Sequence, residues 1–217
     1  MKRGTEDLIG ALSEAVVPVR RLARPSVRAA GWLAFVLVFV GALVAIRGQR
    51  ADIGARLADP DFLVPWIASV LVAGTSALAA FHLTVPGSAR WIAFLPLPPL
   101  AVWLATLGAG CAREISQMGL AAFGTSFDCL EFIVLTSVPL SVALVWMLRR
   151  AAPLAPAGTL AMGVLAAASA ASAGLELYHH IDTSTEALVW HLGTAAAVVL
   201  AGLASGRSVL ALRAVND

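Results

Sequence analysis

The chain has 217 residues, of which 59% are hydrophobic and only 13% are charged, and its mean hydropathy is +0.86. Soluble domains carry about 25% charged residues, so this composition excludes an ordinary water-soluble domain. The net charge is only +2, and the basic residues lie beside the ends of apolar runs, which indicates membrane topology and no nucleic-acid partner. The sequence therefore predicts an all-α fold, a polytopic helical bundle in a lipid bilayer.

Residues 1–28 are predicted to be a cytoplasmic tail with one short helix. Thr5 suits a helix N-cap, and Pro18 stops the helical pattern. Between them lies an apolar stripe at helical spacing: Leu8, Ile9, Leu12, Ala15 and Val16. Four arginines then precede the first apolar run: Arg20, Arg21, Arg24 and Arg28. A helix of about 13 residues is marginal alone in water, so the tail is expected to become ordered on a partner or on the membrane surface.

Six apolar runs are long enough to cross the hydrocarbon core of a bilayer, which is about 30 Å thick. The predicted spans are residues 30–46, 62–85, 91–108, 128–148, 156–176 and 187–205. Residues 29–206 would thus form the transmembrane domain, followed by a C-terminal tail of residues 207–217. The third span carries Pro96, Pro98 and Pro99, which lack backbone donors and should kink or break it.

Small residues recur at four-residue spacing in the last two spans. The fifth span has one such stripe: Ala166, Ala170 and Gly174. The sixth has another: Gly193, Ala197 and Ala201. Because such stripes allow close helix approach, the fifth and sixth spans are expected to lie at the centre of the bundle.

The lysines and arginines predict the orientation. With the N-terminus inside, eleven of the 15 fall on the inner side and four on the outer side, a positive-inside bias. An even number of spans returns the C-terminus to the cytoplasm. Most tryptophans fall near predicted span ends, where interfacial anchors are expected: Trp32, Trp66, Trp91, Trp103, Trp146 and Trp190.

On this topology, several reactive side chains gather at the outer face. Cys111 follows the third span, Cys129 opens the fourth, and Glu176, His179 and His180 lie at the end of the fifth. Thiolate and imidazole ligate zinc and copper, so one interpretation is a metal or redox sensor. The alternatives are ordinary interfacial polar residues or a static disulfide between the two cysteines. No cofactor or metal site is predicted, and Cys129, His179 and His180 are the only candidates for a metal.

The familiar catalytic motifs are missing. The sequence has no His-Glu-x-x-His, no Gly-x-Ser-x-Gly and no Gly-x-x-x-x-Gly-Lys. We therefore expect a protein that binds or signals and is not an enzyme. A small transporter or metal-binding membrane protein that uses the outer Cys/His/carboxylate cluster is the alternative function.

Several short segments together resemble the NrsF family of membrane anti-sigma factors. They occur in the family's order and spacing across nearly the whole chain: Thr5–Ile9, Pro18–Leu22, Arg56–Phe62, Val85–Gly87, Cys129–Ile133, Trp146–Pro153 and Trp190–His191. The resemblance implies a negative regulator in the bacterial inner membrane. Such a protein holds an extracytoplasmic-function sigma factor away from RNA polymerase and releases it on a periplasmic signal.

The resemblance also suggests which residues act. The tail stripe and its first arginines would bind the sigma factor: Leu8, Ile9, Leu12, Val16, Arg20 and Arg21. Cys129 stands where the first family cysteine is expected, but the second position falls at about His179. A disulfide between these two sites is therefore impossible, so the family's thiol pair does not transfer directly. The residues expected to sense the signal are Cys111, Cys129 and His179, and the oligomeric state is left open.

Overall fold

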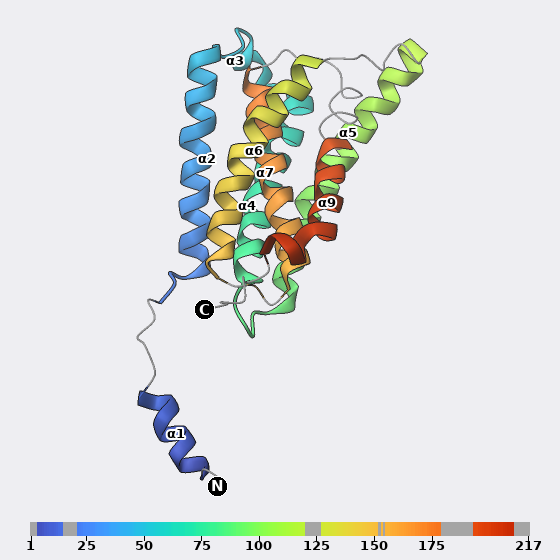
Figure 1. Ribbon diagram of the computed structural model, residues 1–217. Helices are drawn as coiled ribbons and strands as arrows, with labels where there is room; N and C mark the ends of the chain where they lie inside the picture. The colour runs from blue at the N-terminus through green and yellow to red at the C-terminus, as the bar shows by residue number, and fades with distance from the viewer. Residues whose placement is uncertain are drawn as a thin grey trace.

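The computed structural model describes residues 4–14, 21–119, 127–151, 153, 155–178 and 193–210 (Figure 1). Within these residues every regular element is a helix, which confirms the all-α prediction. The elements are α1 (Thr5–Glu14), α2 (Pro25–Arg47), α3 (Ile53–Arg56), α4 (Pro60–His82), the 3₁₀ helix η1 (Arg90–Phe94), α5 (Leu97–Met118), α6 (Phe127–Arg149), α7 (Pro156–Tyr178) and α9 (Gly193–Leu210).

Within the residues that the structure describes, four segments are long and apolar enough to cross a membrane. They are α2, α4, the η1–α5 segment Arg90–Met118, and α7. They correspond to the first, second, third and fifth predicted spans and indicate a membrane protein. The described apolar part of α6, Leu135–Arg149, is shorter, and α9 has 18 residues. The full six-span topology stays a prediction.

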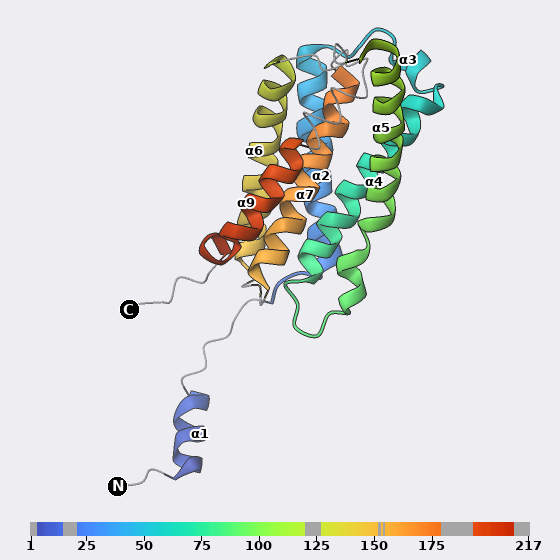
Figure 2. The same cartoon turned by 90° about the vertical axis from the view of Figure 1, so that its right-hand side faces the viewer.

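The long helices run up and down through one bundle (Figures 1 and 2). We call the end at which α2 begins and α4 finishes the tail end, and the opposite end, where α2 and α7 finish, the far end. The tail helix α1 stands apart from the bundle on the side of the tail end (Figure 1).

Proline residues begin several of these helices. Pro25 and Pro60 occupy the first positions of α2 and α4, where a missing N–H costs no intrahelical hydrogen bond. The third span is interrupted as predicted: η1 ends at Phe94 and α5 begins at Leu97. Helix α5 continues beyond the predicted span end near residue 108 and reaches Met118.

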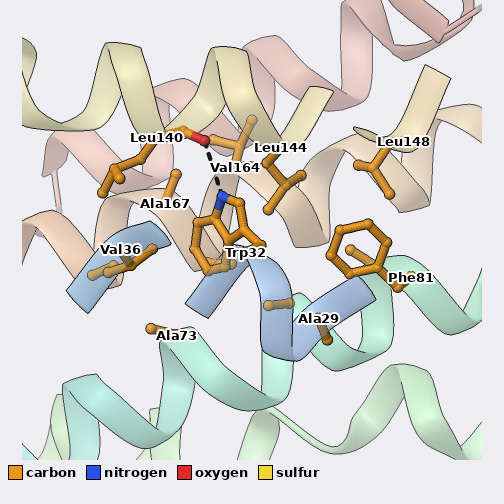
Figure 3. Packing of buried hydrophobic residues seen from close by; sticks show 14 of the residues in the cluster. Ala29, Trp32, Val36, Ala73, Phe81, Leu140, Leu144, Leu148, Val164 and Ala167 are labelled. Carbon is orange, nitrogen blue, oxygen red and sulfur yellow. Dashed lines mark hydrogen bonds between the residues drawn. The ribbon is translucent and has the colours of Figure 1, made fainter. Parts of the chain in front are cut away.

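Helix α7 lies at the centre of the bundle and contacts α2, α4, α6 and α9. The stripe of Ala166, Ala170 and Gly174 is buried, as expected for a central fifth span. Its small side chains let neighbouring helices approach closely. Leu144 and Leu148 of α6 belong to the same apolar core (Figure 3).

The sixth predicted span is not central, which corrects the expectation from its small residues. Gly193, Ala197 and Ala201 of α9 are all exposed, whereas Gly202 and Gly206 are buried and approach α7. Helix α4 lies beside α7, and this pair has the most extensive contact among the described helices. Small residues occur on more than one face of α9, so their spacing alone did not identify the contacting face.

Three tryptophans join helices, contrary to their expected role as interfacial anchors. The Trp32 indole is fully buried and donates a hydrogen bond to the Leu140 carbonyl at 3.1 Å (Figure 3). Trp66 donates similarly to the Ala173 carbonyl at 3.0 Å, and Trp103 is buried between α4 and α5. Two others are exposed, as anchors should be: Trp91 and Trp146.

We predict that Gly206→Ala will weaken the packing of α9 on α7. An added Cβ would lie 2.8 Å from the Ala157 backbone nitrogen and 2.9 Å from the Pro156 carbonyl oxygen, and backbone atoms cannot rotate away. Overpacking of this kind costs about 1–3 kcal/mol, measurable as a lower stability to denaturation in detergent. The matched control is Gly202→Ala, whose Cβ would meet Val164 and Leu160 at ordinary contact distances of 3.5 and 3.6 Å. Equal stability of the two variants would contradict this packing.

Candidate functional site

The tail helix α1 presents an apolar stripe that no other part of the described structure covers. Leu8, Ile9 and Leu12 are 52%, 59% and 61% exposed, and no residue of α1 is buried. Arg21, after the helix, is also exposed. Two further residues of the predicted sigma-binding set lie outside the described residues: Val16 and Arg20. The part of the set that is described is therefore free to meet a partner.

Arg28 is the arginine nearest the membrane, and it belongs to the bundle. It lies in the second turn of α2 and is only 8% exposed. Its guanidinium donates to the Thr84 hydroxyl at 3.3 Å and to the Met147 carbonyl. The guanidinium carbon also lies 4.7 Å from the centre of the Phe81 ring, within range of a cation–π interaction.

These contacts join three segments at the tail end of the bundle. Phe81 and Thr84 lie at the end of α4 and just beyond it, and Met147 lies in the last turn of α6. The Thr84 hydroxyl in turn donates to the Phe81 carbonyl at 2.6 Å, so it accepts from Arg28 in a fixed orientation. Arg28 thus fixes the point at which the tail meets the bundle, a role that its place in a run of arginines did not reveal.

A second arginine, Arg50, is buried at the far end. It holds Asp52 through two parallel hydrogen bonds of 2.7 and 2.9 Å, and its side chain is 1% exposed. Arg56 adds a longer contact to Asp52 at 3.3 Å. The backbone N–H of Arg50 donates to the carbonyl of Leu177 at 3.2 Å. The loop after α2 is therefore attached to the last turn of α7.

Charged side chains lie close to this attachment between the loop and α7. The Arg50 hydrogen bonds, with help from Arg56, hold the pKa of the Asp52 carboxyl well below its usual range. Glu176, one residue before Leu177, also lies within electrostatic range of Arg50. The sequence predicted Glu176 as part of the outer cluster but gave no role to Arg50, which has no local pattern that separates it from the other loop arginines.

A more exposed ion pair links two other helices at the far end. Arg113 of α5 contacts Asp61 of α4 at 3.2 Å, and their side chains are 63% and 72% exposed. Exposed pairs contribute about 0–1 kcal/mol. This contact therefore adds little to the packing of α4 on α5.

Of the three predicted sensing residues, the described part of the structure places the side chain of Cys111 alone. Cys111 lies inside α5, not after the third span, and is a buried free thiol. Cys129 belongs to α6, but its side chain lies outside the described part of the structure. His179 and His180 are outside it as well. Among the described residues, no three potential ligands form a group that could hold a metal ion.

The fold and its four membrane-length helices define an integral membrane protein with a short helical tail. Residues 12–211 match the model of the NrsF family, described as negative regulator of sigma F. The chain therefore belongs to this family, and the resemblance seen in its short segments is confirmed. The family is regulatory, and its activity is negative control of a sigma factor. No curated protein and no solved structure matched the chain.

We predict that protonation of the Asp52 carboxylate lowers the stability of the protein in acid. Because folding lowers its pKa, Asp52 stabilises the folded state above its ordinary pKa of about 3.9, and this contribution is lost progressively as the pH falls from that value through the lowered pKa of the folded state. Melting in detergent between about pH 7 and pH 2 should therefore show a larger loss for the unmodified protein than for Asp52→Asn. Asp7→Asn, in the exposed first turn of α1, is the control. Parallel losses in Asp52→Asn and the unmodified protein would contradict the assignment.

Proposed function

We propose that this protein lies in the bacterial cytoplasmic membrane and holds an extracytoplasmic-function sigma factor through residues 1–28. Membership of the NrsF family supplies the activity. The single observation that favours the tail is the uncovered apolar stripe of α1, formed by Leu8, Ile9 and Leu12. While bound there, the sigma factor is kept away from RNA polymerase.

The chemistry of the tail fits a helix-in-groove contact. An amphipathic helix of 10 residues is too short to be stable alone in water, so it gains order when its apolar face enters a groove on a partner. Val16 and Arg20 extend the proposed surface along the chain, and Arg21 ends it. The basic residues would meet acidic groups at the rim of that groove.

The proposed topology has six spans with both ends in the cytoplasm. Helices α6 and α9 supply the two spans beyond the four membrane-length segments. The start of α2, the ends of α4, α6 and α9 and the start of α7 share the tail end of the bundle (Figures 1 and 2). The positive-inside bias then supports a cytoplasmic tail end. The domains are the tail of residues 1–28, the transmembrane part of residues 29–206, and the C-terminal tail of residues 207–217.

Release is proposed to follow a signal on the periplasmic side. The segments assigned to that side contain Cys129 and His179, and Cys111 lies toward the same end of α5. Because the family's second cysteine position reads as histidine, the signal would act on separate thiols or on a mixed Cys/His site. A simple disulfide switch between Cys129 and residue 179 is excluded by composition.

We predict that Leu8→Asp together with Leu12→Asp abolishes capture of the sigma factor. Two carboxylates on the apolar stripe cannot enter an apolar groove without a large desolvation cost. Co-purification of the full-length protein with the sigma factor encoded beside its gene measures the loss. A reporter of that sigma factor should become active without any inducing signal.

The matched control is Ala11→Asp together with Ser13→Asp. It adds the same charge to the same helix, but on positions beside the stripe. Capture should persist in this control. Equal capture by both double variants would refute the assignment of the binding face.

We also predict that Cys129→Ser reduces the response of the reporter to inducer while repression without inducer is kept. Cys111→Ser is the comparison, because that thiol is buried in α5 and a reagent reaches it less easily. A full response in the double variant Cys111→Ser, Cys129→Ser would eliminate every thiol-based model of sensing.

A further inference from the structure

The tail reaches the bundle through α2, and α2 is attached along a single narrow seam. Its buried residues fall on one face: Arg28, Ala29, Trp32, Val36 and Val40. Most of the rest of the helix faces away from the bundle, with Leu37 and Val38 75% and 73% exposed. Helix α7, in contrast, is buried along nearly its whole length. Of these two helices, α2 can therefore shift with less disruption.

Toward the far end, the seam depends on one glycine. A Cβ on Gly174 of α7 would lie 2.6 Å from Cγ1 of Val40, so the absence of a side chain there lets α2 sit against α7. Valine is branched at Cβ and cannot swing a methyl group away as a longer side chain can. The hydrogen bond from the Arg50 N–H to the Leu177 carbonyl lies just beyond this contact. Leu177 directly precedes the segment that holds His179.

At the tail end, the seam finishes in the Arg28 contacts with Phe81, Thr84 and Met147. Val40 lies twelve residues after Arg28 in the same continuous helix, which separates them by about 18 Å along the axis at 1.5 Å per residue. A helix transmits displacement along its axis because its backbone hydrogen bonds resist bending. The chain then passes directly from Pro25 into the tail.

We propose that α2 is the element that carries the signal from the far end to the sigma-binding tail. The Gly174–Val40 contact and Arg28 are its two positioning points. When α2 is seated against α4 and α7, Arg28 fixes the first turns of α2 and hence the position from which the tail is presented. Displacement of the end of α7 unseats α2, and the tail loses its sigma-holding position. This inference rests on the proposed function and specifies how it is regulated.

The test adds a clashing methyl group between α7 and α2 and then removes the side chain that it clashes with. Gly174→Ala, introduced into the full chain in cells, pushes Val40 away and mimics the signal. Reporter activity without inducer is expected to rise by about five- to thirtyfold, the change that a bias of about 1–2 kcal/mol produces. Adding Val40→Ala removes the clashing methyl groups and restores repression to within about twofold of the unmodified protein.

The matched control is Gly206→Ala, a second wedge against the surface of α7. A Cβ there meets the backbone of Ala157 and Pro156, so it wedges α9 against α7 and leaves the contacts of α2 with α4, α6 and α7 in place. Repression should remain intact in this control. Membrane levels are compared by immunoblot, and captured sigma factor is expressed per inserted molecule, so lower abundance is not mistaken for release.

Arg28→Met tests the second positioning point. It removes the hydrogen bonds to Thr84 and Met147 but keeps an unbranched side chain, and it is expected to raise the uninduced reporter as Gly174→Ala does. Combined, Arg28→Met and Gly174→Ala should raise the uninduced reporter activity no further than either substitution alone, because both unseat α2. Arg24→Met, at an exposed position before the helix, is the control.

Several results would overturn the inference: unchanged repression in Gly174→Ala, no recovery with Val40→Ala, an equal rise in Gly206→Ala, or full additivity with Arg28→Met. The proposed function is judged separately by Leu8→Asp with Leu12→Asp. If that variant releases the sigma factor while the α2 variants do not, only the inference about α2 fails. If neither has an effect, the proposed function fails as well.

Discussion

Close approach of helices to α7 is the constraint on which the rest of the structure depends. Lipid offers no hydrophobic drive for helices to associate, so packing and interhelical hydrogen bonds must hold them together. The run of alanine, serine and glycine in α7 is buried from Thr159 to Leu175 with few interruptions. Because alanine, serine and glycine make up most of this buried surface, four other helices reach it closely. A large residue at Gly174 or Gly163 would separate the helices that these glycines bring together.

Polar side chains then fix the register of the packed helices. Trp32 and Trp66 each donate to a backbone carbonyl of another helix, and Arg28 does the same toward α6. Away from water these donors have few other partners, so each bond favours one alignment of two helices. This arrangement leaves one polar contact region at each end of α2, and the tail continues from one of them. A regulator of this kind must connect the two sides of a membrane. Helix α2 is a continuous element that is attached to the rest of the bundle at both of its ends.

Properties that depend on local sequence were predictable. Hydropathy reflects each segment's own side chains, so the helical class, the membrane-length segments and the break before Leu97 followed from composition and proline positions. The exposed stripe of α1 followed from periodicity, because it depends on spacing within one helix. Family membership followed from short segments whose order along the chain is itself a sequence property.

Properties that depend on distant partners were decided only by the tertiary structure. The run of arginines placed Arg28 in the tail, but its hydrogen-bond partners are Thr84, just beyond α4, and Met147 of α6, which lie 56 and 119 residues away in the sequence. Trp32 looked like an interfacial anchor until the Leu140 carbonyl was brought to its indole. Likewise α9 carries small residues on two faces, and only its packing against α7 shows that Gly202 and Gly206 form the contact. The sequence by itself therefore determined a helical membrane regulator with an exposed tail, and packing determined how that tail is attached.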